Sequence, residues 1–124
     1  MTILAIALGG AGGSVLRYLL GGMVQRAAHA GFPFGTLTVN VIGCLLIGII
    51  VQYYTNLEPS SVVRGFLIVG FCGGFTTFSA FSSETIGLLD GGNYARAALY
   101  VALSVALCLI ATSTGIAVTR LVTR

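Results

Sequence analysis

Four long apolar stretches, joined by three short polar connections, account for nearly all of this 124-residue chain. Six arginines and three acidic residues make up its full charges, so 7% of the residues are charged and 56% are hydrophobic. A soluble domain carries about 25% charged residues, and so few charges cannot cover a surface that faces water. The composition therefore indicates a polytopic membrane protein, and the length allows a single domain over residues 1–124.

Each apolar stretch is long enough to cross a bilayer, which takes roughly 20 residues of α-helix. The first stretch lacks a small-residue cleavage site after a short apolar core, so we interpret it as a membrane span and not as a signal peptide. We expect an all-α fold with four transmembrane helices at residues 3–24, 35–54, 62–89 and 94–122. Such a chain belongs in the cell (inner) membrane as a multi-pass protein.

The arginines are almost evenly divided between the two sides of the membrane. Four spans place both termini on one side, and the arginines then fall into a terminal set and an opposite set: Arg64, Arg120 and Arg124 against Arg17, Arg26 and Arg96. Orientation follows an excess of positive charge in the loops, and here there is almost none. We therefore predict insertion in both orientations and pairing as an antiparallel homodimer; the alternative is that another signal fixes the orientation. The arginines are too few and too scattered for a nucleic-acid surface.

The third stretch contains a segment that an ordinary membrane helix does not need. Residues 70–83 read GFCGGFTTFSAFSS, with four phenylalanines among five hydroxyls and no charge. The pair Gly73 and Gly74 loosens a helix, and the hydroxyls offer local hydrogen-bond partners. Irregular backbone at membrane depth is tolerated only where protein or a wet cavity surrounds it. We expect the third helix to break near its middle, at these glycines, and we take the segment as the first candidate for a functional site.

Polar side chains also lie inside the second and fourth spans. Asn40 needs hydrogen-bond partners in hydrocarbon; it acts either in a helix–helix contact or as a donor that faces a conduit. In the fourth span, polar residues recur at every fourth position and so share one slowly winding stripe: Tyr100, Ser104, Cys108 and Thr112. Such hydroxyls often bond back to their own helix, but four successive steps favour a polar track.

The phenylalanines of the third span admit two interpretations. Packing against lipid or protein is the ordinary one. However, Phe78 and Phe81 share their segment with hydroxyls such as Ser79, and the edge of an aromatic ring carries partial positive charge. Rings presented edge-on could line a path for an anion. Two charges near membrane depth, Arg17 and Glu84, are candidates for the same path, although both lie close enough to span ends to reach water.

The sequence contains no feature of an enzyme active site. It has no nucleophile–base pair, no HExxH motif and no P-loop, so catalysis is not expected. Cys44, Cys72 and Cys108 lie singly in apolar runs without a CxxC pair, which is typical of small buried hydrophobic residues and not of a disulfide framework or a metal cluster.

Two motifs resemble those of one known family. GGFTTFSAFS at residues 73–82, followed by Glu84, and GTLTVNVIG at residues 35–43 are similar to the third-helix and second-helix motifs of the Fluc (CrcB) fluoride channels. Arg17 in a glycine-rich first helix and the polar stripe of the fourth span match as well. The resemblance covers essentially the whole chain. Cys108 stands where relatives usually have serine, and Ala80 where threonine is common.

The resemblance implies a passive, fluoride-selective channel that exports fluoride and protects the cell from its toxicity. It further implies a dual-topology antiparallel homodimer with two pores and a structural Na⁺ at the dimer interface. The implied Na⁺ ligands are the backbone carbonyls of Gly73 and Thr76. The implied fluoride pathway comprises the candidates above: Asn40, Phe78, Phe81, Tyr100, Ser104 and Thr112, together with Ser79, Glu84 and Arg17.

Two other functions remain open at this point. A small four-helix multidrug antiporter has a similar length, but that chemistry needs a deep carboxylate, typically in the first helix, where this chain has Arg17 instead. A membrane assembly subunit that transports nothing is the third possibility, and it would tolerate replacement of Phe78 or Phe81 without any change in ion flux.

Overall fold

Residues 1–29, 31–55 and 57–123 are described by the computed structural model, so Arg124 of the charge balance lies outside them. Among these residues, four segments are long and apolar enough to cross a membrane, which confirms that prediction. They are α1 (Thr2–Ala28), α2 (Phe34–Tyr53), a composite third segment and α6 (Tyr94–Val122). The third segment combines α3 (Ser61–Arg64), the π-helical η1 (Gly65–Cys72), α4 (Gly73–Phe75) and α5 (Phe78–Asp90).

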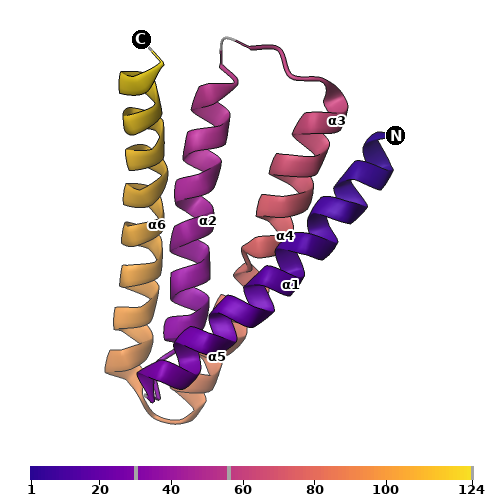
Figure 1. Ribbon diagram of the computed structural model, residues 1–124. Helices are drawn as coiled ribbons and strands as arrows, with labels where there is room; N and C mark the ends of the chain where they lie inside the picture. The colour runs from indigo at the N-terminus through magenta and orange to yellow at the C-terminus, as the bar shows by residue number, and fades with distance from the viewer. Residues whose placement is uncertain (30, 56, 124) are drawn as a thin grey trace.

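The helices associate as two pairs. Figure 1 shows α2 and α6 side by side and running in the same direction, whereas α1 crosses obliquely against the third segment. The most extensive contacts join α2 to α6 and α1 to η1. Both termini lie toward the same end of the molecule, as an even number of crossings requires (Figure 1).

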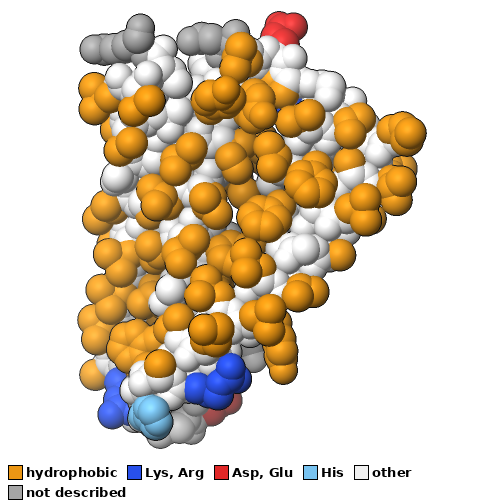
Figure 2. Space-filling model, viewed as in Figure 1, with side chains coloured by type: hydrophobic (Ala, Val, Ile, Leu, Met, Phe, Trp, Pro, Cys, Tyr) orange, Lys and Arg blue, Asp and Glu red, His pale blue; other side chains and the backbone are white. Residues whose placement is uncertain are grey.

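The surface of the molecule suits a lipid environment. Large apolar side chains such as Leu8, Val105 and Ile110 are exposed. Figure 2 shows one face that is apolar across its middle, with arginine and histidine side chains gathered at one end. Charges at the ends and apolar atoms between them are the distribution expected of a membrane protein.

Glycines let α1 approach the third segment at backbone distance. A Cβ added at Gly9 would overlap the carbonyl oxygen of Phe66, and one added at Gly13 would overlap that of Phe71. Without a hydrophobic driving force between helices in lipid, this close van der Waals packing is a main source of helix association. The glycine-rich run of α1 is therefore a packing surface.

We expect Gly13→Ala to lower the free energy of unfolding by about 1–3 kcal/mol, because a methyl group pressed against backbone cannot be relieved by a side-chain rotation. Gly12→Ala is the matched control, since a Cβ there meets nothing within 4 Å, and alanine is a better helix former by up to about 1 kcal/mol. Thermal unfolding of the purified protein in detergent compares the two variants. Equal unfolding temperatures would contradict this role of Gly13.

The third segment breaks near its middle, as predicted, but not at the predicted residues. Gly73 has right-handed helical dihedral angles, and extended backbone follows at Thr76 and Thr77. A Cβ added at Gly74 would lie 2.6 Å from the carbonyl oxygen of Gly10. This glycine therefore allows close packing on α1, and the chain leaves the helix only after that contact ends.

Glycines also set the contact between α2 and α6. A Cβ at Gly48 would overlap the Thr112 carbonyl, and one at Gly115 would lie 2.5 Å from the Leu45 carbonyl oxygen. The Thr112 hydroxyl donates to the Cys44 carbonyl oxygen at 3.1 Å. These contacts fix the register of the two helices and thereby decide which polar side chains face each other.

Candidate functional site

A side chain of α2 bonds to the backbone at the break in the third segment. The Asn40 amide donates from Nδ2 to the Thr77 carbonyl oxygen at 3.0 Å and accepts from the Thr77 backbone N–H at 2.8 Å. Backbone groups that leave a helix in a membrane must find new partners, because unpaired ones cost several kcal/mol. Asn40 therefore makes the helix–helix contact that the sequence left as one of two possibilities.

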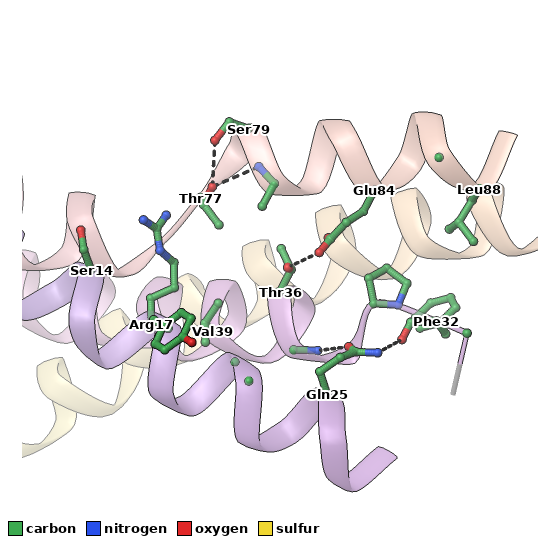
Figure 3. Close-up of a pocket in the computed structure, with 18 residues that line it drawn as sticks. Ser14, Arg17, Gln25, Phe32, Thr36, Val39, Thr77, Ser79, Glu84 and Leu88 are labelled. Atoms are coloured by element: carbon green, nitrogen blue, oxygen red, sulfur yellow. Dashed lines mark hydrogen bonds between the residues drawn. The ribbon is translucent and has the colours of Figure 1, made fainter. Parts of the chain in front are cut away.

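The N-terminus of α5 has its own cap. The Thr77 hydroxyl accepts from the Ala80 backbone N–H at 3.1 Å and lies 3.1 Å from the Ser79 hydroxyl (Figure 3). A threonine at this position satisfies one of the amide groups that the first turn of a helix leaves unpaired. Two further donors from α1 reach the carbonyls beside the break: Ser14 toward Gly74 and Arg17 toward Thr76, both at 3.4 Å.

The polar stripe of α6 faces a second polar stripe on α2. The helices α2 and α6 run parallel, and the contact between Gly48 and Thr112 fixes their register. Residues at four-residue intervals on one helix therefore face residues at the same intervals on the other. The pairs are Thr36 with Tyr100, Asn40 with Ser104, Cys44 with Cys108, and Gly48 with Thr112. The stripe predicted on the fourth span is therefore one half of a two-helix wall.

A carboxylate from α5 joins the first pair of this wall. Glu84 accepts hydrogen bonds from the Thr36 hydroxyl at 2.7 Å and from the Tyr100 hydroxyl at 2.6 Å. Tyr100 is completely buried, and its single O–H is committed to this bond. Figure 3 shows the Glu84 side chain reaching toward Thr36 from the neighbouring helix. The cluster ties α5 to both α2 and α6.

We expect Glu84→Gln to lower the free energy of unfolding by about 1–3 kcal/mol, because the amide nitrogen replaces one of the two acceptor oxygens. Glu58→Gln, at an exposed position in the connection before α3, is the matched control. Tyr100→Phe combined with Glu84→Gln gives a double-mutant cycle, and contact predicts a coupling of about 0.5–3 kcal/mol. Additive effects on thermal unfolding would contradict the pairing.

A groove of about 440 Å³ runs along this wall and beside the break. Its polar lining includes Asn40, Ser104 and Thr77, and the rings of Phe78 and Phe81 lie next to them. The two ring centroids are 5.3 Å apart and the rings are inclined at 45°. Apolar side chains form most of the remaining surface, so the groove presents a few fixed dipoles in an otherwise apolar lining.

Ser104 is the unusual member of the groove. Its hydroxyl oxygen is buried and has no hydrogen-bond partner among the described residues, and the side chain is 7% exposed. A buried hydroxyl without a partner costs about 1–3 kcal/mol by mutational measures. Ser104 lines the groove, but its hydroxyl oxygen is shielded from solvent, so a ligand in the groove would gain this hydrogen bond only after a local movement of the side chain.

A second cavity of about 930 Å³ lies on the other side of the break (Figure 3). It is bordered by α1, the start of α2 and α5, and its lining includes Arg17, Ser79 and Glu84. Thr77 lines both this cavity and the groove. The larger cavity thus holds both charged candidates together with Ser79, and no charged side chain among the described residues lines the groove.

The structure thus divides the predicted site residues into groups. Asn40, Phe78, Phe81 and Ser104 meet in the groove, with Gly73 and Thr76 on its border. Tyr100 and Thr112 line neither space, because the first is buried against Glu84 and the second is bonded to the α2 backbone. Sequence reasoning assigned no role to Thr36 or Thr77. The signal for Thr77 was a hydroxyl just before a helical run, which is typical of an N-cap.

Comparisons with known proteins show the family of this chain. The family model described as "CrcB-like protein, Camphor Resistance (CrcB)" matches residues 4–116. A protein of Geobacter sulfurreducens named fluoride-specific ion channel FluC is 53% identical over 121 residues, which are 96% of this chain and 97% of the relative. Proteins of the same name from Geobacter metallireducens and Rhizobium etli are 50% and 47% identical, covering 97% and 94% of this chain and 98% and 94% of the relatives. The chain belongs to the CrcB family.

Proposed function

We propose that this chain forms a passive, fluoride-selective channel in the cell membrane. It lets out fluoride that has entered as the neutral acid and so protects the cell from fluoride toxicity. Relatives named fluoride-specific channels, about half identical over nearly their whole length, support the ion. The observation that carries the conduction path is a single groove lined by Asn40, Ser104 and two phenylalanine rings.

The chemistry of the groove fits a small, strongly hydrated anion. An Asn side chain has two amide hydrogens, and Asn40 gives one to Thr77, which leaves the other for an ion beside Ser104. The positive edges of Phe78 and Phe81 add weak attraction without fixed charge. Conduction needs binding that is strong enough for entry and weak enough for release, and neutral dipoles meet that condition better than a buried arginine does.

The pathway extends from the groove into the larger cavity past Thr77. Arg17, Ser79 and Glu84 lie there, and we assign them to the entrance: the guanidinium attracts anions, and Ser79 offers a hydroxyl. Glu84 acts through Tyr100 and Thr36 by fixing the helices around the groove. Thr112 lies beyond Cys108 on the same stripe and holds α6 against α2.

The channel is proposed to be an antiparallel, dual-topology homodimer with two pathways. The near balance of arginines between the two ends supports insertion in both orientations. The Phe78 side chain is 78% exposed within one chain, and its place beside the break suits a surface that a second copy covers. Each copy would then supply one groove and part of the other's wall.

A structural Na⁺ at the dimer interface is compatible with the break. The Thr77 N–H turns to Asn40 and so does not close a helical bond to the Gly73 carbonyl, while the Thr76 carbonyl receives one long contact from Arg17. Carbonyl oxygens are the ligands that hard cations accept. The backbone carbonyls of Gly73 and Thr76 therefore suit a Na⁺ ion. A bound Na⁺ would give these carbonyls a partner and raise the electrostatic potential that attracts anions nearby.

Efflux from liposomes that contain only this purified chain tests the function. Fluoride efflux without chloride efflux is the expected result, and empty liposomes give the background. Proton-coupled export of an organic cation would identify a multidrug antiporter instead. Absence of both fluxes would identify an assembly subunit and overturn the proposal.

A further inference from the structure

All three cysteines of the chain line the same groove. They come from three different segments: Cys44 from α2, Cys72 from η1 and Cys108 from α6. All are free thiols; Cys44 and Cys108 are partly exposed, whereas Cys72 is buried. Packing was the only role predicted for them from the sequence, yet all three border one groove.

Cys44 and Cys108 lie on facing turns of α2 and α6. They occupy the turn that precedes the backbone contact between Gly48 and Thr112 on two parallel helices, and the Thr112 hydroxyl is bonded to the Cys44 carbonyl at 3.1 Å. Both side chains line the same groove, one from each of the two helices. The pair is therefore held by the tightest part of the helix packing and needs little rearrangement to bind one atom between the two sulfurs.

We propose that Cys44 and Cys108 form a two-thiolate site for a soft monovalent cation with a filled d shell, such as Ag⁺ or Cu⁺. Thiolates select soft metals over the hard cations that oxygen ligands prefer. Among the residues that the structure describes, no three His, Cys, Asp or Glu side chains gather so as to hold a metal. Two sulfurs without a third ligand suit these cations, which accept linear coordination, and do not suit zinc, which takes four ligands.

Binding is a proton-for-metal exchange without oxidation. Each thiol loses its proton to water, two sulfur–metal bonds form, and the site changes from neutral to a single negative charge. The bound cation lies in the groove wall next to Ser104 and Asn40. The site exists whether or not the groove conducts fluoride.

Silver titration of the full chain in detergent, in chloride-free buffer, tests the site. We expect one Ag⁺ per chain by native mass spectrometry. Cys44→Ala and Cys108→Ala should each lower the affinity by about 10²-fold or more, because chelation by a second thiol is lost. Cys72→Ala is the matched control and should bind as the wild type does. Unchanged binding in Cys108→Ala, or an equal loss in Cys72→Ala, would overturn the proposal.

A second measurement needs no variant and so does not depend on how the variants fold. In the wild-type protein, silver should protect Cys44 and Cys108 from maleimide, with both sites located by peptide mapping. Labelling of both thiols at the silver-free rate would also overturn the site. Fluoride efflux with silver present tests the pathway separately, since silver that binds without slowing efflux removes the groove from the pathway and leaves the metal site in place.

Discussion

Asn40→Ala is expected to reduce fluoride efflux by about 100-fold or more, equivalent to about 2.7 kcal/mol at the barrier. The substitution removes both hydrogen bonds to Thr77, so the break loses the partner of its exposed backbone, and it also removes the amide donor from the groove. Efflux from liposomes measures the effect on conduction. Thermal unfolding in detergent measures the loss of the hydrogen bonds to Thr77, which is expected to cost about 1–3 kcal/mol for each backbone group left unpaired.

Thr38→Ala is the matched control for Asn40. It removes one polar group from the same helix, half a turn away, and Thr38 lines neither the groove nor the larger cavity. Efflux and unfolding temperature close to those of the wild type are expected there. Near-normal efflux from Asn40→Ala would mean that neither the donor nor the geometry of the break matters for conduction.

The four spans could be predicted from the sequence because hydrophobicity is a local property of each stretch. The position of the break could not. Gly73 and Gly74 show only that the backbone is able to bend, whereas the break occurs where a side chain from another helix, Asn40, supplies hydrogen bonds to Thr77. That partnership depends on how α2 packs on the third segment, which no local pattern encodes.

The sequence predicted which types of residue form the candidate site, but it did not predict which residues they bond to. The four-residue repeat on α6 gave the polar stripe correctly as a feature of one helix. It gave no sign that Tyr100 is bonded to Glu84, or that Thr112 is bonded to the α2 backbone. Both bonds depend on helix register, which the contacts of Gly48 and Gly115 determine. Ser104 and Asn40 became the central polar groups because the same register leaves them beside the groove.

Phe81→Ile and Phe78→Ile are each expected to reduce fluoride efflux by about 100-fold or more, a barrier increase of about 2.7 kcal/mol. Isoleucine keeps the apolar bulk but lacks the positive ring edge that we assign to the ion path. Phe66→Ile is the matched control: it makes the same substitution in the third segment, at a partly exposed ring that does not line the groove. Liposome efflux and unfolding temperature are measured for all three variants.

Phe78 gives the clearer result of the two. Its ring is 78% exposed within the chain, so replacing it removes little packing from the monomer, and a large loss of efflux would be assigned to the ring itself. Phe81 also contacts the Tyr100 ring, at 5.2 Å between centroids, so its replacement affects the Glu84 cluster as well. Normal efflux from Phe78→Ile with an unchanged dimer would contradict the ring-edge path, and loss of the dimer would mean that the ring acts through the proposed subunit interface and not through its edge.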